Sequence, residues 1–432
     1  KDIPIRSMIF YNFFNLISIS FYERRMVMKA VKRCYWIGFA ILEISYWCFH
    51  ASFIGFLMSY LLSKGINNTM ASIFMAMFLA AAFAGSFVWG MVCDRFHTNR
   101  KVSIACFLTA GVLMYLIYFS YDRIPMLAGL YLLLGFVCLP NATNIDSWLL
   151  LTCENDLTVY GRIRCLPSLL YAFTSIVLGR MILVFGYSMM LAFGTVFLFA
   201  GTVAAALLPE GRKAVLEQAE GGNGIHSLNQ VFAGGAYRYL IVILLLVGLA
   251  IAPLNNLKMP VLKSVGGTVS DLGVDAFICA AVQVPFIALA GRMERCPLRL
   301  RYLLIAGLPF LTLILAFYAV SPVMVFAGSF LSNIGVGILL PTMRSVTERS
   351  VPGVFRNLGH NIADAVYNSV AGIISLLYSG LVIDLYGVKS MLMICILIVL
   401  IPVIMTCKTA VYHWMLGVLR CGRGEIRETK RI

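Results

Sequence analysis

Long apolar runs, separated by short polar segments, fill almost the whole chain and restrict it to a membrane-spanning fold. A transmembrane helix needs about 20 apolar residues, so 432 residues leave room for about twelve helices joined by short loops. Only 12% of the residues are charged, against about 25% in soluble domains, and the mean hydropathy is +0.90. We therefore expect an all-α integral membrane protein with spans at roughly 34–62, 69–92, 102–121, 124–153, 160–186, 188–208, 238–262, 269–291, 302–320, 322–344, 359–384 and 388–412.

The basic residues gather on alternate loops and predict the orientation of the bundle. A formal net charge of +15 would suit nucleic-acid binding in a soluble protein, but cytoplasmic loops of membrane proteins are also rich in Lys and Arg. We expect a multi-pass protein of the inner membrane with both termini in the cytoplasm, in contact with the lipid bilayer and not with nucleic acid. The loops assigned to the cytoplasm contain Lys29, Lys32, Arg33, Arg95, Arg100, Lys101, Arg162, Arg212, Lys213, Arg292, Arg295, Arg299, Arg301, Arg344, Arg349 and Arg356.

The twelve cysteines are scattered, mostly through the apolar runs, and include no C-x-x-C pair. We interpret them as small buried hydrophobic residues rather than as a disulfide framework or a zinc site. We therefore expect no bound metal and no cofactor.

An internal repeat divides the chain near its midpoint. The longest polar segment, 209–237, contains a glycine-rich stretch at 221–224 that is typical of a flexible linker. We expect a six-helix half at 34–208, this cytoplasmic linker, a second half at 238–413 and a basic tail at 414–432. Matching residues recur at one offset (291 − 90 = 201), namely Gly90 and Gly291, Gly179 and Gly380, Gly186 and Gly387, and Leu139-Pro140 and Leu340-Pro341. Two halves in parallel repeat are a known transporter architecture, with the substrate site between them at mid-membrane.

Residues 1–33 are expected to be a leader or a cytoplasmic segment. The apolar stretch 9–22 is short for a span, and it is followed by Arg24 and Arg25, then by Met26 and Met28. Two AGG codons for the arginines would resemble a bacterial ribosome-binding site, so residues 1–27 could be translated leader before a start at Met28. An interfacial anchor helix is the alternative interpretation.

A pair of opposite charges lies within two consecutive apolar runs. Asp146 is in the fourth run and Arg164 opens the fifth. A charge at the centre of a transmembrane helix costs about 2.5–3.5 kcal/mol on insertion scales, unless it faces the bundle interior and has a partner. Two antiparallel helices joined by a short turn could bring these residues together. A carboxylate that accepts and a guanidinium that donates hydrogen bonds would then form a site for solute hydroxyl groups.

Glu43 is an acidic residue within the first span. Tyr46, Trp47 and His50 follow it at offsets that place all four side chains on one helical face. A carboxyl group kept away from water favours its neutral form and can carry a proton. We interpret Glu43 as a proton-coupling candidate, and a helix-packing carboxylate is the alternative.

A polar stripe marks the eleventh span near its cytoplasmic end. His360 and Asp364 are one helical turn apart within it, and Asn361, Tyr367 and Asn368 extend it. Three interpretations stay open: cavity lining or proton exchange, a solvated helix start, or a metal pair that lacks further ligands.

Three asparagines of the second half could complete a solute site. Asn255 and Asn256 follow a proline in the seventh span, and Asn333 lies in the tenth. Interhelical hydrogen bonds, worth about 0.6–2 kcal/mol each, are the alternative role. Lys258 and Asp275 flank the next loop, where they could pair, and we interpret them as charges at the outer rim.

The loop after the second span resembles the signature loop of the major facilitator superfamily, which follows the pattern Gly-x-x-x-Asp-basic-x-Gly-x-basic-basic. Gly90, Asp94 and Arg95 match its front half, and Arg100 matches the last basic position, with Lys101 after it. His97 and Asn99 depart from the pattern. The resemblance implies a conformational latch formed by Gly90, Asp94, Arg95, Arg100 and Lys101, and ordinary cytoplasmic charge is the alternative.

A second motif is similar to the start of the fifth helix in the lactose permease branch, the oligosaccharide/proton symporters. Residues 160–164 read YGRIR, and Asp146 precedes Arg164 by the branch spacing (164 − 146 = 18). This resemblance implies that Asp146 and Arg164 bind sugar hydroxyls and that Tyr171 stacks on the sugar ring. The branch acid is usually glutamate, and residues 331–340 lack the ionisable pair that the branch carries on its tenth helix.

These features predict a secondary active transporter that moves a small hydroxylated solute, a sugar or a nucleoside, by alternating access coupled to a proton. Glu43 is the first candidate for the proton site, and Asp364 with His360 is the second. An exporter of sugars or amphipathic drugs on the same fold is the main alternative. A membrane enzyme would need a nucleophile or a His–Asp constellation in a substantial loop, which the chain does not offer, and a non-transporting receptor is a further alternative.

Overall fold

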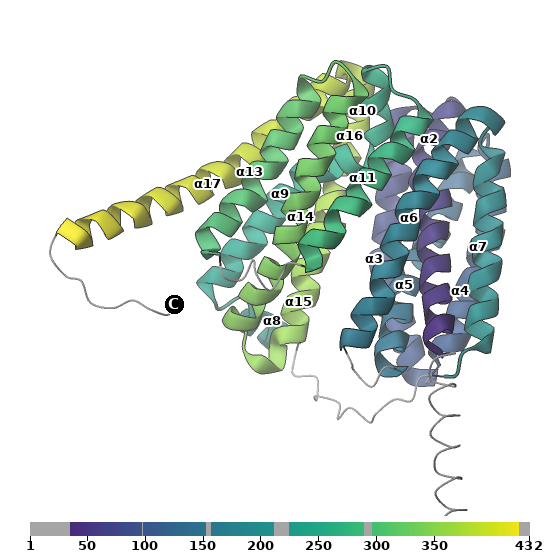
Figure 1. Ribbon diagram of the computed structural model, residues 1–432, viewed down its shortest axis with the longest axis horizontal. Coiled ribbons are helices and arrows are strands. Elements are labelled where there is room, and N and C mark those ends of the chain that lie inside the picture. Colours follow the sequence, from purple (N-terminus) through teal and green to yellow (C-terminus); the bar gives the residue numbers. More distant parts are fainter. Residues whose placement is uncertain (1–34, 97, 153–156, 211–223, 289–295, 423–432) are drawn as a thin grey trace, which may run out of the picture.

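The computed structural model describes residues 35–96, 98–152, 157–210, 224–288 and 296–422 (Figure 1), and within these ranges the protein contains helices and turns but no β-strand. The expected leader, residues 1–33, and the glycine-rich stretch 221–223 lie outside this description. Eleven described helices are long and apolar enough to cross a membrane, and α11 adds one more of 20 residues. The all-α membrane fold with about twelve spans is confirmed.

Six helices form the first half. They are the helix Tyr35–Ser63, which contains the π-helical turn η1 (His50–Ile54) and ends as α2 (Gly55–Ser63), then α3 (Asn68–Phe96), α4 (Asn99–Phe119), α5 (Ile124–Thr152), α6 (Leu157–Phe185) and α7 (Ser188–Leu207). Thr98 begins α4 as an N-cap, because its hydroxyl accepts a hydrogen bond from the backbone N–H of Lys101. Pro140 and Pro167 lie inside helices, which neighbouring helices tolerate in a membrane bundle.

The second half follows a short helix α8 (Gly224–Val231), which lies within the segment expected to be the linker. Its members are α9 (Gly235–Asn256) with its extension α10 (Lys258–Ser264), α11 (Val269–Ala288), α13 (Leu298–Phe317), α14 (Pro322–Ser350), the composite helix Leu358–Tyr386, and α17 (Val388–Gly422). The span Leu358–Tyr386 covers most of α15 (Arg356–Asp364), the π-helical η3 (Ala365–Val370) and α16 (Ala371–Tyr386), and α15 is preceded by the 3₁₀ turn η2 (Gly353–Phe355). In Figure 1 the last part of α17 extends away from the bundle, past residue 413, where the second half was expected to end.

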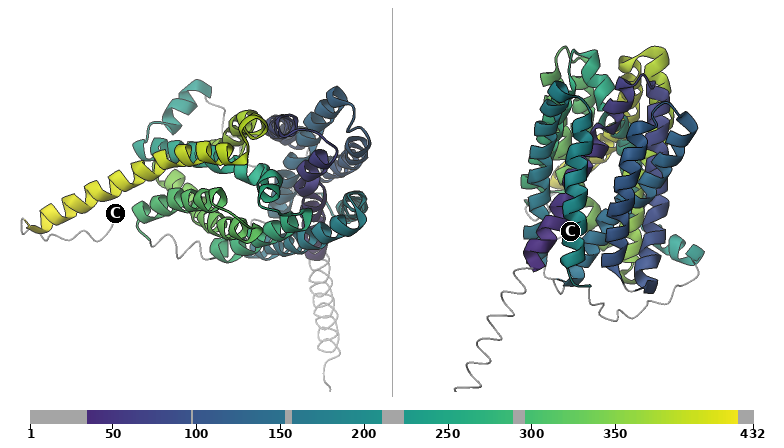
Figure 2. Two further views of the ribbon diagram at one scale, coloured as in Figure 1. Left: turned by 90° about the horizontal axis from the view of Figure 1, so that it is seen from above. Right: turned by 90° about the vertical axis from the view of Figure 1, so that its right-hand side faces the viewer.

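The internal repeat is visible in the backbone. Gly186 and Gly387 have φ angles of 82° and 84°, and each directly follows a helix. Gly65 and Gly266, also 201 positions apart (266 − 65), have φ angles of 85° and 79°. This left-handed conformation after a helix favours glycine strongly. The same turn therefore recurs at corresponding places in the two halves, which lie side by side when seen from above (Figure 2).

Two helix pairs hold the halves together. Helix α6 packs on α11, and α3 packs on α16. A Cβ atom added to Gly179 would crowd the backbone of Gly273, and one added to Gly380 would collide with Asn68 and Ser72. These contacts are equivalent in the repeat, because 380 − 179 and 273 − 72 both equal 201. Small residues thus allow the backbones of the halves to approach closely.

These contacts lie toward one end of the bundle. We call this end the closed end, and it is formed by residues 64–68, 120–123, 186–187, 265–268, 318–321 and 387. We call the opposite end, which contains Arg100 and Arg299, the basic end. At the closed end, Asp384 of α16 accepts four hydrogen bonds from the start of α3, two from Asn68 and two from Thr69. The helices of the halves converge at this end and diverge toward the basic end (Figure 1).

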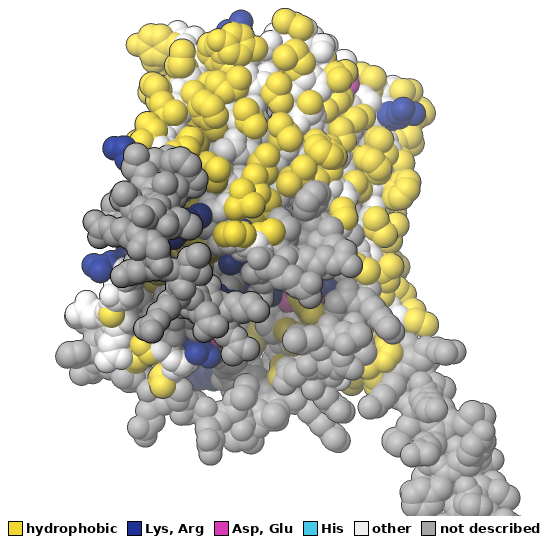
Figure 3. Space-filling model, turned by 60° about the vertical axis from the view of Figure 1, so that its left-hand side comes forward, with side chains coloured by type: hydrophobic (Ala, Val, Ile, Leu, Met, Phe, Trp, Pro, Cys, Tyr) yellow, Lys and Arg dark blue, Asp and Glu magenta, His cyan; other side chains and the backbone are white. Residues whose placement is uncertain are grey.

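The outer surface is largely apolar. Exposed side chains such as Phe87, Leu133, Phe199 and Leu377 point away from the core on several helices. In Figure 3 hydrophobic side chains dominate the upper part of the visible face. Such a surface is stable in contact with lipid chains rather than with water.

Candidate functional site

The charged pair joins α5 to α6 within the first half. The Nε atom of Arg164 lies 3.1 Å from Oδ1 of Asp146, and the Tyr160 hydroxyl donates a hydrogen bond of 3.1 Å to the same oxygen. The side chains of Arg164 and Asp146 are 28% and 27% exposed, so the pair is in contact with solvent. The pairing predicted from the spacing is therefore present, while its role in binding a solute stays a prediction. Sequence reasoning gave Tyr160 no role, although it stands one helical turn before Arg164.

Aromatic rings extend from this pair along the first helix. The guanidinium carbon of Arg164 lies 4.7 Å from the centre of the Trp47 ring, a cation–π distance. The ring of Trp47 is 5.8 Å from that of His50, and His50 is 6.2 Å from Tyr171 of α6. Tyr171 therefore belongs to the same cluster as the charged pair, at its far side. We call Asp146, Arg164, Trp47, His50 and Tyr171 the N-half site.

Glu43 lies against the N-half site with almost no exposure to solvent, at 1%. Its electrostatic neighbours are Asp146, Arg164 and Trp47. Among the described residues its Oε1 atom has no hydrogen-bond partner, and the same holds for Nδ1 of His50. A buried polar atom without a partner is costly. The hydrogen-bonding capacity of both atoms is therefore unused within the described part of the chain, and a role for Glu43 in proton coupling stays a prediction.

Asn141 and Asn144 lie near Asp146 in the sequence, but their side chains pack against α4 instead of facing the N-half site. Asn144 exchanges hydrogen bonds with Asn99 of α4 and donates one to the hydroxyl of Ser103, which in turn donates to Asn141. These two amides therefore fasten α5 to α4. Only Asp146, on another face of α5, contributes to the N-half site.

A second polar cluster, which we call the C-half triad, consists of Lys258, Asp275 and Ser329. The Nζ atom of Lys258 lies 3.3 Å from Asp275 Oδ2 and donates to the Ser329 hydroxyl at 2.8 Å, while this hydroxyl donates to Asp275 Oδ1 at 2.6 Å. The charged side chains are only 6% and 4% exposed. Lys258 and Asp275 therefore pair, as expected from the sequence, but they are buried, and their interpretation as exposed charges of the outer rim is wrong. Helix α10 continues the bundle after α9 and carries Lys258 inward, where α14 covers it.

The asparagines expected to complete the solute site differ in their surroundings. Asn333 accepts a hydrogen bond from Gln283 of α11 and donates to the Ser329 carbonyl, so it continues the C-half triad along α14. Asn256 donates to the carbonyl of Ala252 in its own helix, and Asn255 is exposed. Of the three, only Asn333 joins a polar cluster between helices.

His360 and Asp364 have separate partners. His360 Nε2 lies 3.1 Å from Glu348 Oε1, and Arg356 pairs with the other oxygen of Glu348 at 3.3 Å. Asp364 instead accepts a hydrogen bond from Asn368. The structure therefore does not bring His360 and Asp364 together as a pair, and no cluster of three metal-ligating side chains occurs in the described part of the chain.

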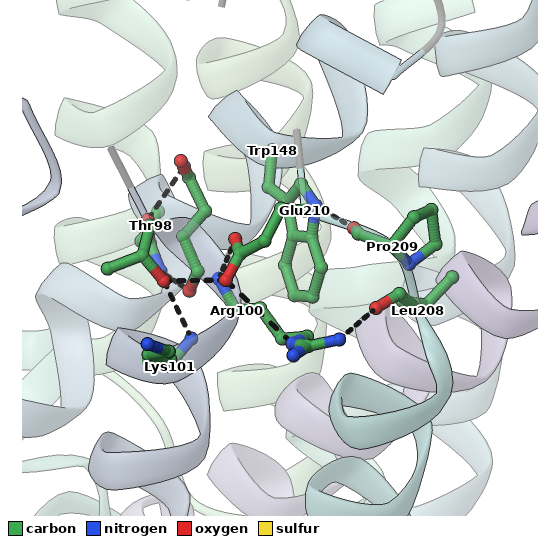
Figure 4. Close-up of polar contacts among 9 residues, drawn as sticks. Thr98, Arg100, Lys101, Trp148, Leu208, Pro209 and Glu210 are labelled. Atoms are coloured by element: carbon green, nitrogen blue, oxygen red, sulfur yellow. Dashed lines mark hydrogen bonds and ion pairs between the residues drawn. The ribbon is translucent and has the colours of Figure 1, made fainter. Parts of the chain in front are cut away.

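The loop that resembles the superfamily signature binds the end of the first half (Figure 4). Arg100 lies 3.8 Å from Glu210 through Nε and donates to the carbonyl of Leu208, and Thr98 donates to Glu210 at 2.7 Å. Arg95 is exposed, Gly90 has open space around its Cα, and the side chain of Asp94 lies outside the described residues. The Lys101 backbone caps α4 through Thr98. These contacts fasten the start of the linker to α4.

The fold and the polar clusters define a class of protein. Two six-helix halves related by a parallel repeat, with polar groups at membrane depth near the boundary between the halves, are the architecture of secondary transporters. The profile of the MFS_1 like family matches residues 36–415, and the chain belongs to this family, which is part of the major facilitator superfamily.

Solved structures agree with this assignment at the level of the fold. A variant of the nucleoside transporter NupG matches with a TM-score of 0.77 and 14% identity over 87% of this chain and 99% of that one. A bacterial homologue of the human lysosomal transporter Spinster, in an inward-facing and unoccupied conformation, gives a TM-score of 0.64 and 12% identity over 87% and 96%. An autoinhibited peptide transporter of the POT family gives 0.66 and 10% over 92% and 98%. A search of curated proteins returns no match.

Proposed function

We propose that this transporter moves a small hydroxylated solute, a sugar or a nucleoside, and that the N-half site binds it. The observation that carries the proposal is the ion pair of Asp146 and Arg164, which is accessible although it lies within spanning helices. An accessible pair at this depth offers acceptor oxygens and donor N–H groups on adjacent atoms. Vicinal hydroxyl groups need this combination, because each hydroxyl donates one hydrogen bond and accepts others.

The aromatic groups of the N-half site favour a solute with a flat or ring-shaped body. The guanidinium of Arg164 already lies over the Trp47 ring. This contact fixes the guanidinium and leaves the outer edge of the guanidinium for the solute. Tyr171 lies at the far side, next to His50, where its ring can stack on a sugar or a base. The resemblance to the oligosaccharide/proton symporters supports a sugar, and the similarity in fold to NupG supports a nucleoside.

Glu43 is the proton carrier in this proposal. It is buried against Asp146 and Arg164, and one of its oxygens has no hydrogen-bond partner among the described residues. Uptake of a proton at Glu43 would change the charge beside the solute site, so solute and proton would influence each other's binding. Asp364 is the second candidate, because it is exposed on α15, where Asn368 donates a hydrogen bond to it and Arg344 is an electrostatic neighbour.

Alternating access provides the transport step. If the basic end faces the cytoplasm of the inner membrane, as its arginines suggest, the conformation seen here is inward-facing, since the halves meet at the other end. The halves, 34–208 and 238–413, would then rock about the contacts of α6 with α11 and of α3 with α16. Opening the closed end would break the contacts of Gly179 and Gly380 described above.

The variant Arg164→Ala tests the proposal. We expect it to abolish uptake into vesicles while the protein is still inserted, because the solute loses its donor and Asp146 loses its partner. Arg180→Ala is the matched control, since Arg180 is exposed on the same helix. The solute would first be chosen by a thermal-shift screen over sugars and nucleosides, and counterflow would give the direction of transport. Normal uptake by inserted Arg164→Ala would remove the N-half site from the mechanism.

A further inference from the structure

Two tyrosine hydroxyl groups lie buried near the basic end of the second half and have no role in the proposed transport cycle. Tyr239 of α9 and Tyr302 of α13 each stand four positions after the first residue of their helix (239 − 235 and 302 − 298). Their rings meet edge to face, with centres 5.2 Å apart. Neither hydroxyl group has a hydrogen-bond partner among the described residues. A buried donor without a partner is costly, so we expect a partner that the described chain does not supply.

A buried arginine adds a positive charge to these hydroxyl groups. Arg301 directly precedes Tyr302 and is only 3% exposed. The electrostatic neighbours of Tyr302 are Tyr239 and Arg301, and no carboxylate of the described residues is among them. The polar ends of the three side chains therefore gather in one place, and all three can donate hydrogen bonds. The group that completes this cluster is an acceptor with negative charge.

The starts of α9 and α13 add to the positive potential of the cluster. In the described part of the chain neither helix has a side-chain cap, and neither has an acidic residue in its first turn. The start of α4 differs, because the backbone N–H of Arg100 donates to the carboxylate of Glu210. A helix N-terminus favours an anion, and phosphate groups bind there readily. Two such helix starts beside Arg301 therefore favour a phosphate group.

The surroundings of the cluster indicate that the phosphate belongs to a lipid. Leu298 and Leu300 at the start of α13 are 37% and 44% exposed, and Val242, one turn after Tyr239, is 42% exposed. Apolar side chains beside a charged cluster at the start of two spanning helices are suited to acyl chains below a headgroup. Basic sites between transmembrane helices near the membrane surface bind anionic headgroups.

We propose that Tyr239, Arg301 and Tyr302 bind the phosphate group of an anionic phospholipid in the leaflet at the basic end. Tyr239 is only partly buried, so rotation of its side chain gives a phosphate access to both hydroxyl groups. The two hydroxyl groups then donate to phosphate oxygens, and Arg301 compensates their charge. The acyl chains lie over the exposed leucines of α13.

The internal repeat shows that the fold does not need this cluster. Gly38 and Lys101 stand at the equivalent positions of the first half (239 − 201 = 38 and 302 − 201 = 101). Neither position carries a tyrosine there, although the six-helix architecture is the same. The paired tyrosines are therefore a feature of the second half alone, as a specific binding site would be.

Binding of defined lipids to the purified full-length protein, followed by native mass spectrometry, tests the proposal. Phosphatidylglycerol and phosphatidylcholine with the same acyl chains both contain a phosphate, but only phosphatidylglycerol has a net negative charge. We expect phosphatidylglycerol to bind about tenfold or more tightly than phosphatidylcholine. Inorganic phosphate in large excess should not displace it, because the ion lacks the acyl chains.

The paired variant Tyr239→Phe with Tyr302→Phe removes the two hydroxyl groups and keeps both rings. Its unfolding temperature without lipid should stay the same or rise, because neither hydroxyl group has a partner among the described residues. Its Kd for phosphatidylglycerol should rise about tenfold or more. Tyr131→Phe is the matched control, since the Tyr131 hydroxyl of α5 is also buried without a partner in the described part of the chain, but in the other half. This control should bind the lipid as the wild type does.

Equal affinity of the wild type for the two lipids would overturn the proposal, and so would an unchanged Kd in the paired variant. Displacement by inorganic phosphate would assign the cluster to a soluble phosphate compound and overturn the lipid assignment. If the paired variant does not fold, Tyr239→Phe alone decides the matter, with a Kd that should rise about threefold or more. None of these measurements depends on solute uptake, so they are independent of the result for Arg164→Ala.

Discussion

Asp384 offers the sharpest test of how the halves close. Its Oδ1 accepts hydrogen bonds from Asn68 N and Nδ2 at 3.2 and 2.7 Å, and its Oδ2 accepts from Thr69 N and Oγ1 at 2.7 and 2.6 Å. A carboxylate of one half thus caps the first turn of a helix in the other half, where the helix dipole favours negative charge. The contact exists only while the closed end is shut.

Asp384→Asn keeps the shape of the side chain and removes half of its acceptors. An amide at this position can accept from Asn68 through its oxygen, but its NH₂ group faces the two donors of Thr69. The residue is exposed, so solvent screening reduces the loss to about 1–2 kcal/mol. That corresponds to a roughly 5–30-fold larger fraction of molecules with the closed end open.

The matched control is Asp271→Asn. Asp271 accepts from Thr268 N and Oγ1 at 2.7 and 2.8 Å, so the chemistry is the same, but both residues belong to one half. Labels attached through genetically encoded amino acids at positions 122 and 320, which are exposed at the closed end in different halves, report its opening as a distance distribution. This distribution should shift toward longer distances in Asp384→Asn and stay as in the wild type in Asp271→Asn. Equal distributions in the two variants would refute the reasoning that Asp384 acts between the halves.

Three further substitutions test other parts of the account. Gly380→Ala should also open the closed end, because overpacking against the Asn68 backbone costs about 1–3 kcal/mol, and the same label pair measures it. Glu43→Gln should lose proton-driven accumulation and keep solute counterflow in vesicles, and accumulation at the wild-type level would exclude Glu43 as the proton carrier. Arg100→Ala should lower the free energy of unfolding by about 1 kcal/mol or less, because its bond to Glu210 is a partly exposed ion pair, and a loss above about 3 kcal/mol in thermal unfolding would contradict this role.

The features that depend on local pattern were predicted from the sequence. Apolar runs gave the spans, because hydropathy over a window of one membrane thickness decides insertion. The glycine offset of 201 gave the repeat, and the turns at Gly186 and Gly387 now explain it by a shared left-handed conformation. The pairing of Asp146 with Arg164 followed from two helices joined by a short turn, whose geometry leaves few alternatives.

The features that depend on which helices become neighbours were not predicted. Lys258 and Asp275 flank a loop in the sequence, but Ser329, more than 50 positions away, covers them in the fold. Likewise Asn141 and Asp146 lie in one polar stretch, and only the position of α4 decides that the amide packs between helices while the carboxylate faces the site. Hydropathy and residue spacing predict which residues share a face of a helix, but they do not predict which other helix packs against that face.

The central claim is that the charged pair binds solute hydroxyl groups, and a double-mutant cycle between protein and solute tests it most directly. Equilibrium binding to the purified protein would be measured for the preferred sugar or nucleoside and for its single deoxy analogues, with wild type and with Asp146→Asn. A hydrogen bond to a charged group is worth about 1.5–3 kcal/mol, so at least one hydroxyl should show a coupling energy in this range with Asp146. Coupling energies near zero for every hydroxyl would contradict the claim.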